Sequence, residues 1–297
     1  MGTGLPSTTM PLDLSFIDKP SEPSTFTYGW KDTVLYALGI GAKNATKESP
    51  NELDWLYEGR GPKVIPSFVV VPMFQPMLDC IVKTGGDLAM VVHGAQRVRL
   101  HAAIPPKGTM TTVARIRGIY DLRKFAIVIV DTEIKDASGT LLADTASQII
   151  IRGAGGFGGQ TPPKEEKVAE IPKGQEPDFR IEEGTTREQA LLYRLSGDWN
   201  PLHADPAMAA SVGFEQGPIL HGLCTFGHMV RHAAKGACGG DASKLTGFEA
   251  SFKKPVWPGD TLVTEGWKLP GGKVALLMKV KERDEIVVGG AWATFKE

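Results

Sequence analysis

The sequence is poor in cysteine and carries almost no net charge. Its 297 residues include three cysteines, whose positions match no metal-binding or disulfide pattern, which is typical of a protein from a reducing compartment. The formal net charge is -1, so the chain has no overall basic field to hold nucleic acid or an anionic membrane. The longest apolar runs, such as residues 125–130, are strand-sized and too short to span a bilayer. We therefore expect an ordinary globular protein that binds neither nucleic acid nor membrane.

Neither end of the sequence carries a recognisable sorting signal. Residues 1–23 are rich in Ser, Thr and Pro and lack the apolar core of a signal peptide, so we predict a flexible N-terminal arm. The last three residues, Phe295-Lys296-Glu297, are not a peroxisomal address of the Ser-Lys-Leu type. On this ground alone the expected location is cytoplasmic.

A weak internal duplication organises the rest of the chain. Three short patterns occur twice in the same order: Leu35-Tyr36-Ala37-Leu38 and Leu192-Tyr193-Arg194-Leu195, His93-Gly94 and His221-Gly222, and residues 106–110 and 258–262. Both halves then run into apolar, β-branched segments at residues 125–131, 145–151, 274–280 and 286–295. Short helices followed by antiparallel strands predict an α+β fold.

The two copies are joined by a segment rich in glycine and proline. Residues 153–159 match the G-x-G-x-x-G pattern of dinucleotide-binding loops, but Thr161-Pro162-Pro163 prevents the helix that such a site requires. We therefore predict a flexible crossover over residues 153–178. It separates an N-terminal half at 24–152 from a C-terminal half at 179–297.

The two halves differ after their His-Gly pairs. The interval from Gly222 to Gly259 is long and contains the apolar stripe of a helix, whereas the interval from Gly94 to Gly108 is short. Residues 96–101 within that short interval alternate like a strand. We predict that the first half lacks the helix that would cover its sheet. The apolar groove left behind collapses, is lined by other segments or holds a ligand, and we favour the ligand.

Residues 198–206 carry the side chains best suited to acid–base chemistry. Asp198 and His203 are five positions apart, and a helix would turn them about 140° away from each other. Pro201 prevents that helix and allows a tight turn that brings them together. An acid and a base that converge on one point can activate a single water molecule. Taken singly, Asp198 could be a turn residue and His203 a hydrogen-bonded core residue.

The neighbouring segments predict helix ends. Thr185 to Glu188 fits a capping box for a helix that ends at Gly197, and Asp205 before a proline is a routine structural helix start. Gly222 stands where the apolar-striped helix begins, so its free amide can face a developing negative oxygen. A metal site built from His203, Asp205 and His221 is conceivable, but no closely spaced ligand pair supports it, and we expect none.

Residues 193–203, followed by 218–222, closely resemble the signature of the hydratase 2 (MaoC-like) family. That family includes the hydratase domain of peroxisomal multifunctional enzyme type 2 and the bacterial (R)-hydratases. The resemblance extends to residues 32–41, 93–94, 153–159 and 254–261. It implies a double hot dog fold, in which antiparallel sheets each wrap a helix and the first half lacks that helix. It also implies a location in the peroxisome and a homodimer of the double unit.

The resemblance implies an activity and a role for each motif residue. Water adds to a trans-2-enoyl-CoA thioester to give (3R)-3-hydroxyacyl-CoA in fatty-acid β-oxidation, with no metal or other cofactor, and the groove would hold a long acyl chain. Asp198 and His203 activate the water, Asn200 orients them, and the amide of Gly222 binds the thioester oxygen. The residues expected to bind substrate are His93, Gly94, Trp199, Pro201, Leu202, Lys253 and Lys254.

The sequence departs from the family at two positions that concern CoA binding. Leu122 follows Asp121 where relatives often have lysine, and Ser251 precedes Phe252 where relatives often have arginine.

Two other functions stay open. A dehydratase acting on acyl-carrier-protein thioesters would favour a basic docking surface, of which the near-neutral chain gives no sign. A non-catalytic acyl-CoA-binding protein would have lost Asp198 or His203, and both are present.

Overall fold

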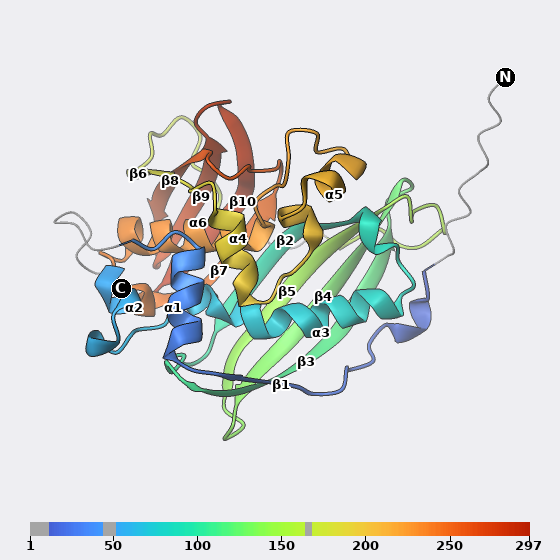
Figure 1. Cartoon of the computed structure of the whole chain (residues 1–297), viewed down its shortest axis with the longest axis horizontal. Coiled ribbons are helices and arrows are strands. Elements are labelled where there is room, and N and C mark those ends of the chain that lie inside the picture. Colours follow the sequence, from blue (N-terminus) through green and yellow to red (C-terminus); the bar gives the residue numbers. More distant parts are fainter. Residues whose placement is uncertain (1–11, 44–51, 164–167) are drawn as a thin grey trace.

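The computed structural model describes residues 12–43, 52–163 and 168–297, and a ten-stranded antiparallel sheet runs through it (Figure 1). The strand order is β1-β3-β4-β5-β2-β7-β10-β9-β8-β6. The strands are β1 (Ser24–Tyr28), β2 (Val91–Leu100), β3 (Gly108–Asp121), β4 (Phe125–Asp136), β5 (Leu141–Arg152), β6 (Phe179–Gly184), β7 (Leu245–Phe252), β8 (Thr261–Leu269), β9 (Lys273–Val280) and β10 (Glu285–Phe295). The four apolar segments predicted as strands lie in β4, β5, β9 and β10.

The sheet consists of the same five-strand pattern twice. The first half has the order β1-β3-β4-β5-β2, and the second half repeats it as β6-β8-β9-β10-β7. The halves join where β2 pairs with β7, from Ala95 opposite Ser251 to Arg99 opposite Gly247. Residues 106–110 and 258–262 lead into the equivalent strands β3 and β8. The predicted duplication and double hot dog fold are therefore confirmed.

The helices that follow the first strand of each half also correspond. Residues 35–38 lie in α1 (Trp30–Gly39), and their counterparts lie in α4 (Gln189–Tyr193) and the 3₁₀ turn η6 (Arg194–Ser196). The two helices pack against each other, and the ring centroids of Tyr36 and Tyr193 are 6.1 Å apart. Related residues from the two copies thus meet at the centre of the molecule.

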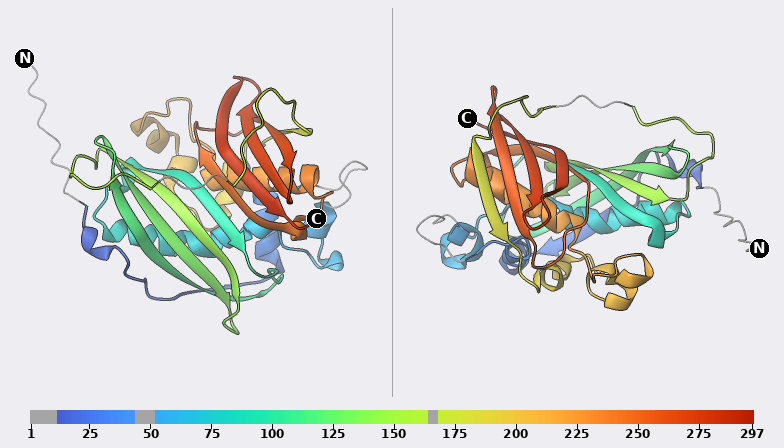
Figure 2. Two further views of the ribbon diagram at one scale, coloured as in Figure 1. Left: turned by 180° about the vertical axis from the view of Figure 1, so that it is seen from behind. Right: turned by 90° about the horizontal axis from the view of Figure 1, so that it is seen from above.

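The His-Gly pairs do not correspond, and this corrects one prediction. His221 and Gly222 open the helix α6 (Gly222–Ala237), whereas His93 and Gly94 lie inside β2. The covering helix of the first half comes earlier in the chain. It is α3 (Val70–Lys83), which lies between β1 and β2 as α6 lies between β6 and β7, and which packs across β3 and β4 (Figure 2). The predicted absence of this helix is wrong, because the two intervals were compared out of register.

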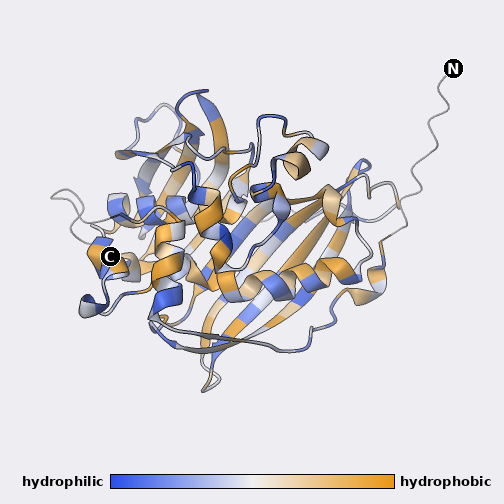
Figure 3. Cartoon of the chain, viewed as in Figure 1, coloured by the Kyte–Doolittle hydropathy of each residue, from blue (hydrophilic) through white to orange (hydrophobic). Residues whose placement is uncertain are grey.

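The two covering helices differ in how deeply they are buried. Every residue of α6 from Leu223 to Ala234 is buried. On α3, residues such as Met73 and Met77 are buried, while Gln75 and Asp79 face solvent, so apolar and polar residues alternate along it (Figure 3). Consequently α6 forms the centre of a core, whereas α3 forms an outer wall. Among the described residues, none of the helices has the length and apolar character needed to cross a membrane.

The start of the described chain is anchored, contrary to the predicted flexible arm. The amide of Asp13 donates to the carbonyl oxygen of Thr84 at 2.9 Å, and Ile17 forms a bridge to Ile116 on β3. Leu12 is buried in the core of the first half. The prediction is wrong for residues 12–23, because apolar side chains between the Ser and Pro residues bury themselves against the sheet. Its remainder, residues 1–11, falls outside the described residues.

The glycine-rich start of the crossover is held by one carboxylate. Asp121 accepts hydrogen bonds from the amides of Arg123, Gly156 and Gly158 at 2.7–2.8 Å, and these bonds lower the pKa of its carboxyl group. Gly156 and Gly158 have φ values of 86° and 78°, which glycine adopts without strain. No helix begins here, in agreement with the exclusion of a dinucleotide loop. The boundaries of the predicted crossover coincide with the end of β5 and the start of β6.

Candidate active site

Asp198 and His203 lie on the loop that follows α4. This helix begins at Gln189, so the predicted capping box at Thr185 is wrong. The hydroxyl of Thr185 instead donates to the carbonyl oxygen of Asp260 and accepts the amide of Gly259, both at 2.9 Å. Tertiary contact with the loop before β8 has thus replaced a local cap. The predicted stop at Gly197 is confirmed, because this residue ends η6 with a φ of 116°.

A proline-initiated turn brings the two side chains back toward each other. Pro201 opens the 3₁₀ turn η7 (Pro201–His203), and the side chain of Asn200 caps it by accepting the amide of Leu202 at 3.0 Å. The amide of Asn200 donates to Asp198 Oδ1 at 3.2 Å. Asn200 therefore orients Asp198 through its main chain and shapes the turn through its side chain.

The carboxylate of Asp198 and the imidazole of His203 converge on one point. A carboxylate oxygen of Asp198 and one ring nitrogen each of His203 and His221 all lie within 4.8 Å of one another. His203 Nδ1 lies 2.8 Å from the carbonyl oxygen of Ile219 and must donate to it, because a carbonyl can only accept. In the neutral ring this leaves Nε2 of His203 as the proton acceptor.

His221 is the residue of this site whose position the sequence did not predict. Its ring stacks on that of His203 with centroids 3.7 Å apart, and its Nε2 donates to the main-chain carbonyl of Asp198 at 3.1 Å. The side chain is fully buried. In the sequence, His221 stood out only as the neighbour of Gly222 and as a conceivable metal ligand.

Burial shifts the pKa values of Asp198 and His203 in opposite directions. It raises the pKa of Asp198, against the opposing charge of His203 and the amide of Asn200. It lowers the pKa of His203, against the opposing charge of Asp198. Each shift favours the neutral form of its group, so burial opposes the charged pair and favours the movement of a proton from His203 to Asp198. This is the property that a shared acid–base pair requires.

A small pocket with a volume of about 10 Å³, room for about one water molecule, opens beside Asp198. Its lining residues come from α3, from the end of α4 and η6, and from the first turn of α6: Val70, Val71, Phe74, Tyr193, Ser196, Asp198 and Leu223. Gly222 precedes Leu223 and is the first residue of α6, so its amide has no acceptor within the helix and lies at the positive helix end. A side chain at this position would touch the ring of Phe252, at 3.5 Å.

His93 is linked to the site through Phe252. The ring of His93 meets Phe252 edge-on with centroids 5.4 Å apart, and Phe252 in turn covers Gly222. Burial lowers the pKa of His93 to about 4, so the ring is neutral. Gly94 packs closely against Ile150, where an added Cβ would lie 3.0 Å from its side chain.

The other predicted substrate contacts lie at the surface. Trp199 is 69% exposed, Pro201 is exposed and Leu202 is half-buried, all on the turn beside Asp198. Lys253 and Lys254 are exposed where β7 ends, directly after Phe252. Lys254 lies 3.7 Å from a carboxylate oxygen of Glu285. The turn thus carries its exposed residues beside Asp198, and the two lysines follow Phe252, which covers Gly222.

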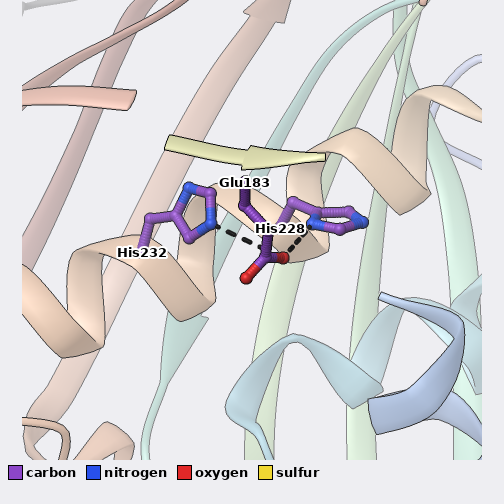
Figure 4. Close-up of side chains that lie close together, drawn as sticks. All are labelled: Glu183, His228 and His232. Atoms are coloured by element: carbon purple, nitrogen blue, oxygen red, sulfur yellow. Dashed lines mark hydrogen bonds and ion pairs between the residues drawn. The ribbon is translucent and has the colours of Figure 1, made fainter. Parts of the chain in front are cut away.

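Asp205 does not belong to the group of Asp198, His203 and His221 whose ligand atoms lie close together. Asp205 Oδ1 accepts the amide of Ala207 at 2.8 Å and caps α5 (Pro206–Ser211), which confirms its structural role. A second group with metal-ligand geometry, Glu183 with His228 and His232, lies deeper in the second half (Figure 4). In it, Glu183 Oε1 is 3.1 Å from His228 Nδ1 and 3.8 Å from His232 Nε2.

The charges around Glu183 show that its partner is an arginine. The fully buried guanidinium of Arg231 donates to both oxygens of Glu183, at 2.8 and 3.2 Å, and to Glu52 at 2.7 Å. Lys235 pairs with Glu52, so two carboxylates meet two cations. Burial disfavours the charge of Glu183, but hydrogen bonds from the histidines and the charge of Arg231 outweigh it and hold its pKa below the usual range. A metal ion here would stand beside the guanidinium, which disfavours its binding.

This cluster also connects the two halves. Arg231 on α6 donates to the carbonyl oxygen of Ile40 at 2.8 Å, at the end of α1 in the first half. The side-chain amide of Gln189 and the thiol of Cys224 both donate to the neighbouring carbonyl of Gly39. Side chains of the second half therefore cap the last carbonyls of α1.

Comparison with known proteins agrees with this architecture. Residues 26–153 match the family described as MFE-2 hydratase 2 N-terminal domain, and residues 168–289 match the family described as MaoC like domain. The chain is 36% identical over 282 residues to Enoyl-CoA hydratase 2, peroxisomal, of Arabidopsis thaliana, which covers 89% of each protein. It is 37% identical over 283 residues to 3-hydroxyacyl-thioester dehydratase Y of Mycobacterium tuberculosis, which covers 93% of this chain and 94% of the relative.

A solved structure shows the same similarity in three dimensions. The MaoC-like dehydratase from Phytophthora capsici superimposes with a TM-score of 0.83 at 33% identity, over 95% of this chain and 98% of that one. Because sequence identity and fold agree over nearly the whole length of both proteins, the chain belongs to the hydratase 2 (MaoC-like) family.

Proposed function

We propose that this protein is an (R)-specific 2-enoyl-CoA hydratase that adds water to trans-2-enoyl-CoA and forms (3R)-3-hydroxyacyl-CoA in fatty-acid β-oxidation. The observation that carries this proposal is the convergence of the Asp198 carboxylate and the His203 imidazole beside the pocket at the start of α6. Relatives of nearly equal length named enoyl-CoA hydratase 2 and 3-hydroxyacyl-thioester dehydratase support it.

The proposed reaction uses the pair twice. Water held between Asp198 and His203 loses a proton to the pair while its oxygen bonds to C3 of the substrate. The electron pair of the C2–C3 double bond moves toward the thioester oxygen, which the amide of Gly222 stabilises at the positive end of α6. The pair then returns a proton to C2, so the hydroxyl group at C3 and the hydrogen at C2 are added to the same face. The oxidation level of the molecule as a whole does not change, so no redox cofactor takes part.

The acyl chain enters the pocket under α3. The apolar side chains of Val70, Val71 and Phe74 form the wall opposite Asp198. The groove expected from a missing helix is replaced here by a pocket with room for about one water molecule under α3. These side chains must move apart to admit the acyl chain, so we infer a preference for short chains. The exposed Lys253 and Lys254 at the end of β7 are positioned to attract the CoA phosphates as they approach.

Replacing Phe74 with alanine should shift the chain-length preference. Removal of the ring lengthens the pocket, so we expect kcat/KM for decenoyl-CoA to rise about tenfold relative to crotonyl-CoA, or about 1.4 kcal/mol. The measurement is the hydration rate for enoyl-CoA substrates of four to sixteen carbons. Val82→Ala, on the exposed side of the same helix, is the matched control and should leave the profile unchanged. If the natural protein prefers the sixteen-carbon substrate and Phe74→Ala does not change this preference, the pocket assignment is contradicted.

The substrate carrier distinguishes the proposal from its alternatives. Crotonyl-CoA and the crotonyl thioester of an acyl carrier protein should be compared in one assay, with the product configuration read by (3R)- and (3S)-specific dehydrogenases. We expect faster hydration of the CoA thioester and a (3R) product. Faster hydration on the carrier protein would favour the dehydratase of fatty-acid or polyketide synthesis. Binding of crotonyl-CoA without turnover would favour a non-catalytic acyl-CoA-binding protein.

We also propose that the protein is a homodimer and that it acts in the peroxisome. The relative from Arabidopsis thaliana is named Enoyl-CoA hydratase 2, peroxisomal, and this name supports the location. Light scattering on the purified chain tests the dimer, and microscopy of a fluorescent fusion in a eukaryotic cell tests the location.

A further inference from the structure

We propose that His221 is a positioning residue, whose single ring holds both Asp198 and His203 in place for the proposed hydration. The inference rests on the proposed function of the pair and assigns a role to a third residue. His221 is the last residue before α6, so the ring stands on the rigid start of a buried helix.

The two contacts of the ring reach the two members of the pair separately. Nε2 donates to the main-chain carbonyl of Asp198, 23 positions earlier in the chain, at 3.1 Å. The ring face stacks on His203 with centroids 3.7 Å apart and an angle of 28° between the planes. One contact fixes the peptide that carries the carboxylate, and the other fixes the plane of the imidazole.

Without these contacts the pair has few other restraints. Asp198 Oδ1 accepts only the amide of Asn200 among the hydrogen bonds described for its carboxylate, and that amide belongs to the same turn. His203 is held through Nδ1 by the carbonyl of Ile219, about which the ring can still tilt. Loss of His221 would therefore let the carboxylate and Nε2 of His203 move apart.

The charge state of His221 fits positioning rather than proton transfer. Burial, together with the nearby charges of His203 and Arg194, holds the pKa of His221 well below its usual range, so the ring is neutral. Besides Asp198, His203 and Arg194, its titratable neighbour is Tyr193, whose ring centroid lies 4.9 Å away. Its Nδ1 is buried without a hydrogen-bond partner in the part of the chain that the structure describes. A neutral ring adds no charge that would disfavour a proton on His203.

Two substitutions separate the two contacts. His221→Phe keeps an aromatic ring for stacking but removes the donor to Asp198, and His221→Gln keeps a donor but removes the ring. A displacement of about 1 Å can lower a rate about 100-fold, so we expect kcat for crotonyl-CoA to fall about 10- to 100-fold in each folded variant. KM should stay within about threefold, because His221 is not among the residues that line the pocket.

The pH profile gives a readout that a merely structural role would not move. When Asp198 and His203 separate, the carboxyl loses part of the attraction that opposes its burial, so its pKa rises further. The acid limb of kcat/KM should therefore shift to higher pH in His221→Phe. The control is His101→Phe, at an exposed ion pair with Asp144 in the first half, and its rate and profile should match those of the natural chain.

The outcomes decide between three cases. A lower kcat with a shifted acid limb, at a normal far-UV spectrum and thermal melting point, supports the role of His221. Unchanged kcat and pH profile per folded molecule, with or without a lower melting point, overturns it. If His221→Phe does not fold, His221→Gln decides by the same criteria. The proposed function fails separately, if Asp198→Asn and His203→Gln remain active.

Discussion

Asp198→Asn and His203→Gln are each expected to fold normally and to hydrate crotonyl-CoA about 10²–10⁴ times more slowly than the natural chain. Asn cannot accept the proton of the attacking water, although it preserves the shape of the carboxylate. Gln has no titrating nitrogen to replace Nε2 of His203. Because the two groups share one proton, the double variant should be little slower than either single variant. Steady-state hydration rates with circular dichroism on each protein provide the measurement.

Asp205→Asn is the matched control for Asp198→Asn. It lies on the same loop, but its carboxylate caps α5, a role that asparagine also fills well. Its rate should remain within about twofold of the natural rate. An Asp198→Asn variant that keeps more than a tenth of the natural rate would remove the carboxylate from the proposed mechanism, and the same result for His203→Gln would remove the imidazole.

Arg231→Met is expected to destabilise the protein by about 3–5 kcal/mol, because it removes the guanidinium that pairs with buried Glu183 and leaves Glu52 with Lys235 alone. Urea denaturation followed by tryptophan fluorescence measures this loss. Arg60→Met is the matched control. Its pair with Asp54 is exposed at the surface, with a distance of 3.4 Å, so its loss should cost less than about 1 kcal/mol.

The same cluster should make stability depend on pH in acid. The pKa of Glu183 is depressed in the folded state, so its contribution is present above its unfolded pKa and is lost as the pH falls. Burial also lowers the pKa of His228 to about 4, so the folded state binds fewer protons than the unfolded state below the usual histidine value of about 6.5. Stability should therefore fall from about pH 6.5 downward. If Arg231→Met lowers the free energy of unfolding by no more than Arg60→Met does, the account of the cluster is contradicted.

The strands and the catalytic turn were predictable because short-range physics determines them. Alternation of β-branched and polar residues predicts β4, β5, β9 and β10, and Pro201 rules out the helix that would separate Asp198 from His203. The helix α3 was missed because the search for it was confined to the interval after His93-Gly94, whereas it precedes β2. Pro76 stands inside this helix. Proline is unfavourable inside an isolated helix, and here packing of the apolar face on β3 and β4 compensates for it.

By itself, the sequence determined the duplicated strand pattern, the helix ends at Gly197 and Asp205, and the local turn that carries the acid and the base. Only the tertiary structure decided that α3 closes the pocket, that His221 stacks on His203, and that Arg231 of one half caps the carbonyl of Ile40 in the other. The physical reason is distance along the chain. Turn and strand preferences act among near neighbours, whereas buried polar groups take partners that only the completed fold brings within hydrogen-bonding distance, as for Arg231 and Ile40, 191 positions apart.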